Sequence, residues 1–209
     1  MAEADYMTVR GFAEKSFTEK KSEFIGYIKP VSDNDEAVAF INEIRAKHRK
    51  ATHNVYAYIT RKDSVSRYSD DGEPQGTAGV PVLDVLRKEG LTDVCCVVTR
   101  YFGGILLGGG GLVRAYSHSA ALAVEAAEIM IMCRCFPVTV RLSYELYGRI
   151  SYILPEFEVK QKEPVFGEDV TISFYVKEKL YEPLLKKITD SSSGKAIITA
   201  GELTYENFA

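Results

Sequence analysis

The first third of the chain shows the spacing of strands followed by that of a helix. Between residues 11 and 31, apolar side chains such as Phe24 and Ile28 are separated by polar ones, which predicts strands joined by a turn. Ser32 or Asp33 then offers a side chain suited to cap the start of a helix. The apolar stripe of that helix consists of Ala37, Phe40, Ile41 and Ile44.

The middle of the chain predicts two more strands and two more helices. Residues 55–60 are aromatic and β-branched, as strands are, and residues 93–102 are almost continuously apolar, which indicates a buried strand. Between them, Pro81 suits the first turn of a short helix that ends near Arg87. Residues 103–111 are predicted to be a loop and the Ala-rich residues 112–128 a long helix.

The last third of the chain shows a different order of predicted strands and helices. We therefore expect a boundary near residues 131–134 that separates domains 1–131 and 132–209. The predicted elements are a strand (136–142), a helix (144–154), two strands (157–162 and 170–176), a helix (179–189) and a strand (195–203). This βαββαβ order is that of a ferredoxin-like sandwich. The expected fold class is therefore α+β with two domains.

The composition is ordinary for a globular protein, with 46% hydrophobic and 26% charged residues among 209. Its 26 basic and 29 acidic residues give a net charge of -3, so a nucleic-acid partner would have to meet a local concentration of positive charge. No stretch approaches the roughly 20 apolar residues that span a bilayer, and the N-terminus lacks the apolar core of a signal peptide. We therefore expect a cytoplasmic protein with no membrane partner, no cofactor and 4 reduced cysteines.

The strongest candidate for a binding site is the glycine-rich segment between the buried strand and the long helix. Unpaired backbone N–H groups at a helix start carry partial positive charge and suit an anion such as phosphate. Arg100 before the loop and Arg114 in the first helical turn would add charge-assisted hydrogen bonds, and His118 shares a helix face with Arg114. The predicted phosphate- or RNA-binding residues are Arg100, Gly103, Gly104, Gly108, Gly109, Gly110, Gly111, Arg114 and His118.

The glycine spacing has a second interpretation. The spacing of these glycines matches neither a Walker loop, which ends in GK[ST], nor a Rossmann turn. In the second interpretation, the glycines bind no ligand and only permit close packing of the helix on the strand and unusual φ values. Both interpretations stay open on the sequence.

Candidate catalytic residues lie in two other segments. Asp70, Asp71 and Glu73 surround Gly72 and would suit an acid–base pair or a hard cation, although Asp and Gly are also ordinary turn residues. His53, just before a predicted strand, is a candidate general base or a histidine with a structural hydrogen bond. No further acidic or histidine cluster joins them, so we predict no metal site.

A basic run ends the first predicted helix. Arg45, Lys47, Arg49 and Lys50 would extend a phosphate-binding surface. Cations are also favoured at helix C-termini by the helix dipole, which is the simpler explanation.

Four segments carry a family resemblance: KKSEFIGY (20–27), ATHNVYAY (51–58), YSDDGEPQGTAGVPVLDVL (68–86) and VVTRYFGGILLGGGGLVRAYSHSAALA (97–123). Across essentially its whole length the chain resembles the IMPACT family, the YigZ-like proteins. The resemblance implies a first domain folded like the second domain of ribosomal protein S-five, and a second domain like the last domain of elongation factor G. It implies by analogy a role in translation regulation, with RNA, the ribosome or a translation factor as partner.

Three functions are thus expected, in order of preference. The first is an RNA- or ribosome-associated protein without catalysis, and the second is an enzyme acting on a small phosphorylated or peptide-like substrate. The third is a protein-interaction module. A pocket joining the acid–base candidates to residues 108–111 would favour the enzyme, and a flat surface there would count against it.

Overall fold

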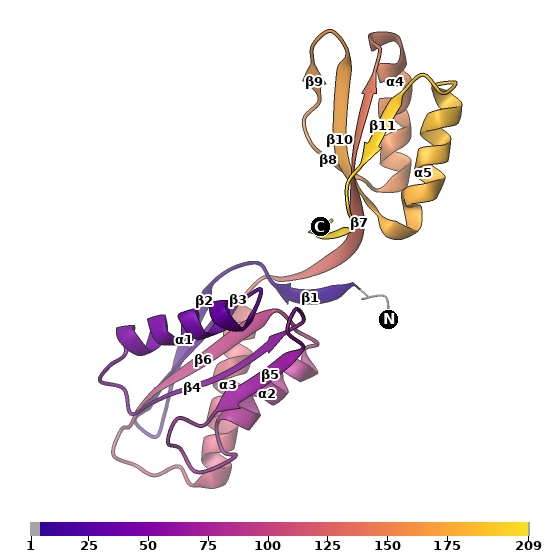
Figure 1. The fold of residues 1–209 in the computed structure, drawn as a ribbon. Helices are drawn as coiled ribbons and strands as arrows, with labels where there is room; N and C mark the ends of the chain where they lie inside the picture. The colour runs from indigo at the N-terminus through magenta and orange to yellow at the C-terminus, as the bar shows by residue number, and fades with distance from the viewer. Residues whose placement is uncertain (1–4, 209) are drawn as a thin grey trace. The chain divides into compact units, whose positions relative to one another are not determined.

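The computed structural model describes residues 5–208 and divides them into two compact units (Figure 1). The first unit is Tyr6–Met130, and the second contains the described residues from Ile131 onward together with Asp5. Each unit combines one sheet with helices, as expected for a two-domain α+β protein.

The first unit is built on an antiparallel five-stranded sheet of order β2-β3-β6-β4-β5. Its strands are β2 (Ala13–Glu19), β3 (Ser22–Pro30), β4 (His53–Thr60), β5 (Val65–Ser69) and β6 (Val94–Tyr101). A short first strand, β1 (Tyr6–Val9), adds Val9 to the core of the same unit. The helices are α1 (Asn34–Lys47), α2 (Gly79–Lys88) and α3 (Gly109–Ala126).

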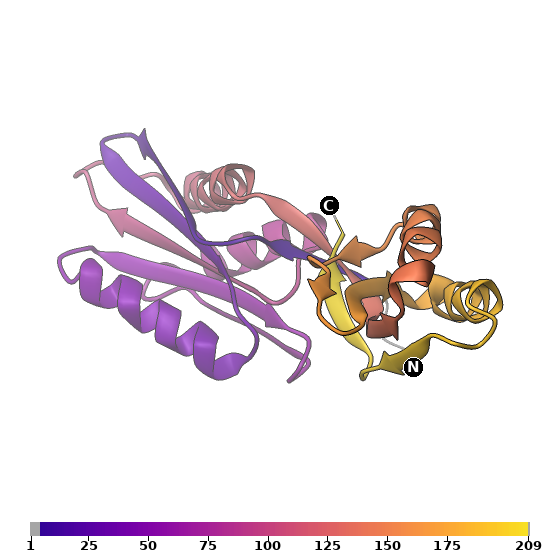
Figure 2. The ribbon, with the colours of Figure 1, turned by 90° about the horizontal axis from the view of Figure 1, so that it is seen from above.

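Helices cover both faces of this sheet: α1 lies on one face, and α2 and α3 lie on the other (Figures 1 and 2). The central strand β6 shows why its sequence is continuously apolar. Cys95 and Val97 pack in the cluster that includes α1, whereas Cys96 and Val98 pack in the cluster that includes α2 and α3. Because successive side chains of a strand point to opposite faces, both sets must be apolar.

The helix starts follow the sequence signals in one case and depart from them in another. Asp33 caps α1 by accepting a hydrogen bond from the Glu36 backbone N–H at 3.0 Å, as predicted. The expectation that the long helix begins at residue 112 is wrong, because α3 begins at Gly109. Glycine is a weak helix former, but the packing of Leu112 and Tyr116 in the core stabilises the preceding turn as well.

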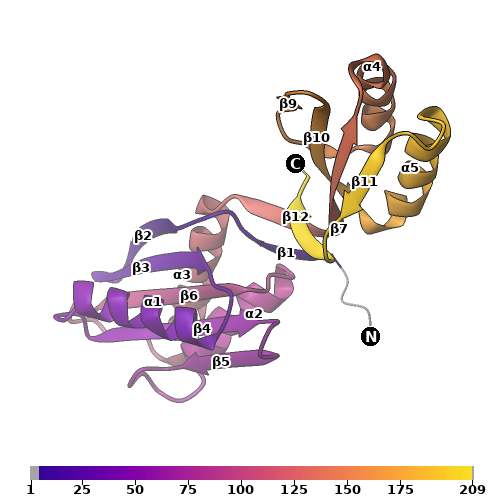
Figure 3. The ribbon, with the colours of Figure 1, turned by 45° about the horizontal axis from the view of Figure 1, so that its top comes forward.

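The second unit has the sheet order β11-β7-β10, with β8 and β9 on the far edge of β10. The strands are β7 (Ile129–Leu142), β8 (Lys160–Gln161), β9 (Val165–Phe166), β10 (Val170–Lys177), β11 (Ile197–Ala200) and β12 (Thr204–Asn207). The helices α4 (Tyr144–Ile153) and α5 (Glu178–Ser191) cover one face of the sheet (Figure 3). This is the ferredoxin-like arrangement, with the second strand of the motif broken into two short pieces.

Two expectations for this unit need correction. The strand predicted from residue 157 begins only at Lys160, because Leu154–Phe157 forms a 3-10 helix that continues α4. The short strands β9 and β12 were not predicted, since two to four residues are too few to show a hydrophobic period. In the part of the chain that is described, no helix combines the length and the apolar character needed to cross a membrane.

Candidate functional site

The glycines before and within α3 fall into three physical groups. Gly103 is required by packing, since a Cβ there would lie 1.9 Å from the Lys21 carbonyl oxygen. Gly104 and Gly108 have φ values of +82° and +75°, which L-residues with side chains rarely adopt. Gly111 is crowded by Leu107, whose Cβ would be 3.0 Å away.

Gly109 and Gly110 belong to none of these three groups. A Cβ on Gly109 would meet only the Thr77 methyl group at 3.9 Å, and a Cβ on Gly110 only the Arg114 guanidinium at 3.8 Å. Both are ordinary contact distances, and neither glycine has a positive φ. The fold of this chain therefore does not explain why these two positions lack a side chain.

A pocket of about 370 Å³ opens at this helix start, and we name it the α3 pocket. Its walls come from the beginning of β4, the loop after β5, the end of β6 and the loop into α3. It is lined by Thr52, His53, Glu73, Pro74, Arg100, Phe102, Leu106, Leu107, Gly108, Gly109 and Leu112. The structure thus brings two acid–base candidates and three phosphate-binding candidates into one cavity of the size of a small ligand site.

Glu73 is the centre of the polar wall of the α3 pocket. Its Oε1 accepts a hydrogen bond from Arg100 Nη1 at 2.6 Å and another from the Tyr116 hydroxyl at 2.7 Å. The Arg100 and Glu73 side chains are only 6% and 4% exposed, so the pair is almost fully desolvated. Burial, followed by the adjacent Glu73 carboxylate, raises the pKa of Tyr116 well above its usual value, so the hydroxyl remains a donor.

Arg100 is therefore not a free cation. Its charge is balanced by Glu73, its Nη2 lies 3.4 Å from the Ser22 hydroxyl, and its Nε is buried without a hydrogen-bond partner. The guanidinium also lies 5.5 Å from the centroid of the Phe102 ring. Arg100 shapes the pocket wall more than it adds net positive charge.

His53 is held in one orientation by the backbone. Its Nδ1 lies 2.8 Å from the Asp71 carbonyl oxygen, which can only accept, so Nδ1 carries the proton. Its Nε2 lies 3.6 Å from Glu73 Oε1, too far for a hydrogen bond. In the neutral ring, Nε2 is thus an acceptor that faces the pocket beside a carboxylate.

The two aspartates predicted with Glu73 have structural contacts instead. Asp70 accepts hydrogen bonds from three backbone N–H groups, those of Gly76, Ala78 and Gly79, and so fixes the loop to the start of α2. Asp71 accepts from Arg45 Nη2 and from the Asn54 backbone N–H, both at 2.7 Å, and so fixes the loop to β4. Neither lines the α3 pocket, and the turn interpretation describes both.

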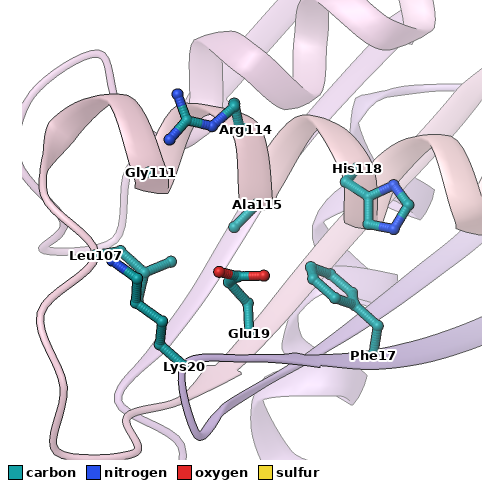
Figure 4. Close-up of a pocket in the computed structure, with 8 residues that line it drawn as sticks. All are labelled: Phe17, Glu19, Lys20, Leu107, Gly111, Arg114, Ala115 and His118. Atoms are coloured by element: carbon teal, nitrogen blue, oxygen red, sulfur yellow. The ribbon is translucent and has the colours of Figure 1, made fainter.

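Arg114 and His118 lie on a second, smaller cavity of about 270 Å³ (Figure 4), which we name the Arg114 groove. It is lined by Phe17, Glu19, Lys20, Leu107, Gly111, Arg114, Ala115 and His118. The His118 ring packs edge-on against Phe17, with centroids 4.7 Å apart. Arg114 and Lys20 form no ion pair with any described residue, and Leu107 lines both this groove and the α3 pocket.

The basic run after α1 is partly neutralised. Arg45 pairs with Asp71 at 2.7 Å, and Lys47 pairs with Glu14 at 3.1 Å. Arg49 and Lys50 are exposed and unpaired within the described residues.

Among the residues that sequence reasoning missed, three contribute most to the chemistry of the site. Thr52 and Phe102 line the α3 pocket, and Tyr116 binds Glu73 from α3. The register of the sheet is what connects them, since His53 lies opposite Arg100 across β4 and β6. A pairing between strands so distant in sequence leaves no local signal.

Comparison with known proteins agrees with the resemblance. The model of the Impact N-terminal domain matches residues 20–124, and that of a domain of unknown function, DUF1949, matches residues 140–195. The chain is 40% identical over 201 residues to the IMPACT family member YvyE of Bacillus subtilis, covering 96% of this chain and 93% of that protein. It is 45% identical over 144 residues to the IMPACT family member YigZ of Escherichia coli, covering 68% and 71% respectively.

A solved structure described as a hypothetical protein has the same overall fold. It superposes with a TM-score of 0.62 at 28% identity and covers 96% of this chain and 98% of its own. Because both domains match and a 40% identical relative is aligned over 96% of this chain, the chain belongs to the IMPACT family.

Proposed function

We propose that this protein acts in translation by binding RNA, and that the α3 pocket receives one unpaired nucleotide. The translational role is carried over from the IMPACT family. The RNA contact is supported chiefly by one observation: the α3 pocket joins an open helix start at Gly109 to an exposed aromatic ring, Phe102. The first feature suits a phosphate and the second a base.

The charges near the pocket indicate how such a contact would be balanced. Arg100 is neutralised by Glu73, so the phosphate would meet the partial positive charge of the α3 start. The unpaired Arg114 and Lys20 of the adjacent Arg114 groove would meet the neighbouring phosphates of the same strand. Binding is then expected to be modest and strongly salt-dependent.

Fluorescence anisotropy with a labelled RNA tests this proposal. The same sequence is offered single-stranded and annealed to its complement, at low and high salt. We expect the single strand to bind more tightly and its affinity to fall with salt. Equal binding of the duplex, or no binding at low salt, would contradict the proposal.

Two variants locate the contact. Phe102→Ala should weaken binding about tenfold or more, since stacking on an aromatic ring contributes about 1–3 kcal/mol per base. Arg114→Ala should reduce the salt slope by about one. Lys88→Ala, which removes an exposed charge from α2, is the matched control and should change neither.

A second candidate function is an enzyme that acts on a small phosphorylated substrate. It is favoured by the presence of His53 and Glu73 in the α3 pocket together with Gly108 and Gly109. His53 Nε2 would be the proton acceptor, since Nδ1 is occupied by the Asp71 carbonyl. Conversion of a nucleotide or sugar phosphate by the wild type, lost in His53→Ala, would support this function over simple binding.

A further inference from the structure

The polar wall of the α3 pocket presents two acceptors side by side. His53 Nε2 is an acceptor because Nδ1 donates to the Asp71 carbonyl. The Glu73 carboxylate is also an acceptor, and both of its hydrogen bonds, from Arg100 and Tyr116, use Oε1. No described residue donates to Glu73 Oε2 or to His53 Nε2. When the His53 ring is neutral, neither group satisfies the other, because two acceptors 3.6 Å apart have no proton between them.

This wall therefore suits a ligand with adjacent hydrogen-bond donors. A ligand that supplies both donors would form two hydrogen bonds with this wall, one of them to a charged acceptor. A third group, the Thr52 hydroxyl, favours a hydrogen-bond acceptor on the ligand. Thr52 Oγ1 accepts from the Phe102 backbone N–H at 3.1 Å, so the hydroxyl proton of Thr52 remains available for an acceptor on the ligand.

The remaining walls of the α3 pocket suit a flat ring. Phe102 is 46% exposed, and Leu106, Leu107 and Leu112 form the apolar lining near it. Bases in single-stranded RNA are recognised by stacking on aromatic rings and by hydrogen bonds to their Watson–Crick edges. The arrangement fits a nucleobase better than an open-chain polyol.

Among the four RNA bases, only guanine carries two adjacent donors, N1–H and the 2-amino group, next to a carbonyl acceptor. Adenine and cytosine each place a ring acceptor beside their single amino group, and uracil has one N–H between two carbonyls. We infer that the α3 pocket selects guanine, with His53 and Glu73 accepting from its N1–H and 2-amino groups. The inference rests on the proposed function, since it names the base that the RNA contact would read.

The test compares short unpaired oligouridines that carry a single guanine, inosine or adenine at the same position. Inosine differs from guanosine only in lacking the 2-amino group, so it removes one of the two donors. The intact chain should bind the guanine oligonucleotide about tenfold more tightly than the inosine one, as expected for one lost hydrogen bond to a charged acceptor, and should bind adenine no better than inosine.

A variant assigns the base contact to the pocket. His53→Ala removes the acceptor for N1–H, which guanine and inosine share, so it should weaken binding of both oligonucleotides by a similar factor while leaving binding of plain oligouridine in place. Tyr68→Ala, which alters an equally exposed aromatic residue on β5 outside the α3 pocket, should leave both affinities unchanged. Circular dichroism and thermal unfolding establish that both variants are folded.

The possible failures are distinct. Equal affinity for guanine and inosine with intact RNA binding would overturn the guanine assignment and leave the proposed function standing. Unchanged affinity for the guanine and inosine oligonucleotides in His53→Ala would overturn the role of His53. Absence of any RNA binding would remove the proposed function and the inference together.

Discussion

The two unexplained glycines at the start of α3 give the most direct test of a ligand at this site. Gly109→Ala places a methyl group where the nearest atom of the chain is the Thr77 methyl carbon, 3.9 Å away. Gly110→Ala places one 3.8 Å from the flexible Arg114 side chain. Neither substitution meets a steric obstacle within the protein. Gly108→Ala, by contrast, forces a side chain onto a residue with a φ of +75°.

The magnitudes follow from these geometries. Replacing Gly by Ala where the native backbone already suits Ala stabilises a protein by about 0.4–1 kcal/mol, because the unfolded chain loses conformational freedom. Gly109→Ala and Gly110→Ala should therefore raise the free energy of unfolding slightly. Gly108→Ala should lower it by about 1–3 kcal/mol, the range for a residue in a glycine-only region. Binding should change differently: the added methyl at Gly109 lies in the α3 pocket and should weaken RNA binding about tenfold.

Chemical denaturation and RNA anisotropy on the same three variants separate the two effects. The expected signature for Gly109→Ala is higher stability with weaker binding. Unchanged RNA affinity in a stabilised Gly109→Ala protein would refute the reasoning, because it would show that no ligand uses the open space at this position. A destabilised Gly109→Ala protein would show that the glycine serves the fold after all.

Three further predictions concern the fold that supports the site. Gly26→Ala should destabilise the first unit by about 1–3 kcal/mol, measured by denaturant unfolding, since its Cβ would lie 2.5 Å from the Ser119 carbonyl oxygen of α3. Asp70→Ala should lower stability by about 2 kcal/mol and increase amide exchange at the start of α2, because three backbone N–H groups lose their acceptor. Burial raises the pKa of Cys96 from 9.0 to about 12, so its thiol should resist alkylation in the native protein at pH 8, and the stability that it contributes while protonated should fall as the pH rises from about 9 toward 12.

The sequence predicted the elements of the fold where the deciding interactions are local. The Asp33 cap and the apolar stripe of α1 lie within a few residues of each other, so both are readable from spacing alone. The start of α3 was misplaced because glycine propensity argues for a loop, whereas packing of Leu112 and Tyr116 decides the outcome. Long-range packing of this kind has no local signature.

In the candidate site, too, long-range contacts decide what the sequence could not predict. Three carboxylates within four residues look equivalent in the sequence, yet Asp70 and Asp71 fix the loop to neighbouring elements and only Glu73 lines the α3 pocket. Glu73 is held at the pocket by Arg100, and Arg100 lies directly opposite His53 in the pairing of β6 with β4. The register of β4 with β6 thus selects which carboxylate is available to a ligand, and no spacing rule within the loop contains that information.

Substitutions in the buried Glu73–Arg100 pair are expected to change both the folding stability and the RNA affinity of this protein. Removing one member of such a pair leaves an uncompensated buried charge and is expected to destabilise the protein by about 3–5 kcal/mol, so loss of RNA binding in Glu73→Ala or Arg100→Ala would not by itself identify a ligand contact. The informative positions are those that the fold does not need, which are the open glycine at 109 and the exposed ring of Phe102. A substitution that leaves folding stability unchanged but abolishes RNA binding distinguishes a ligand site from a structural network. In the α3 pocket these two positions lie beside the buried pair that shapes it, so the site and its structural support can be tested separately.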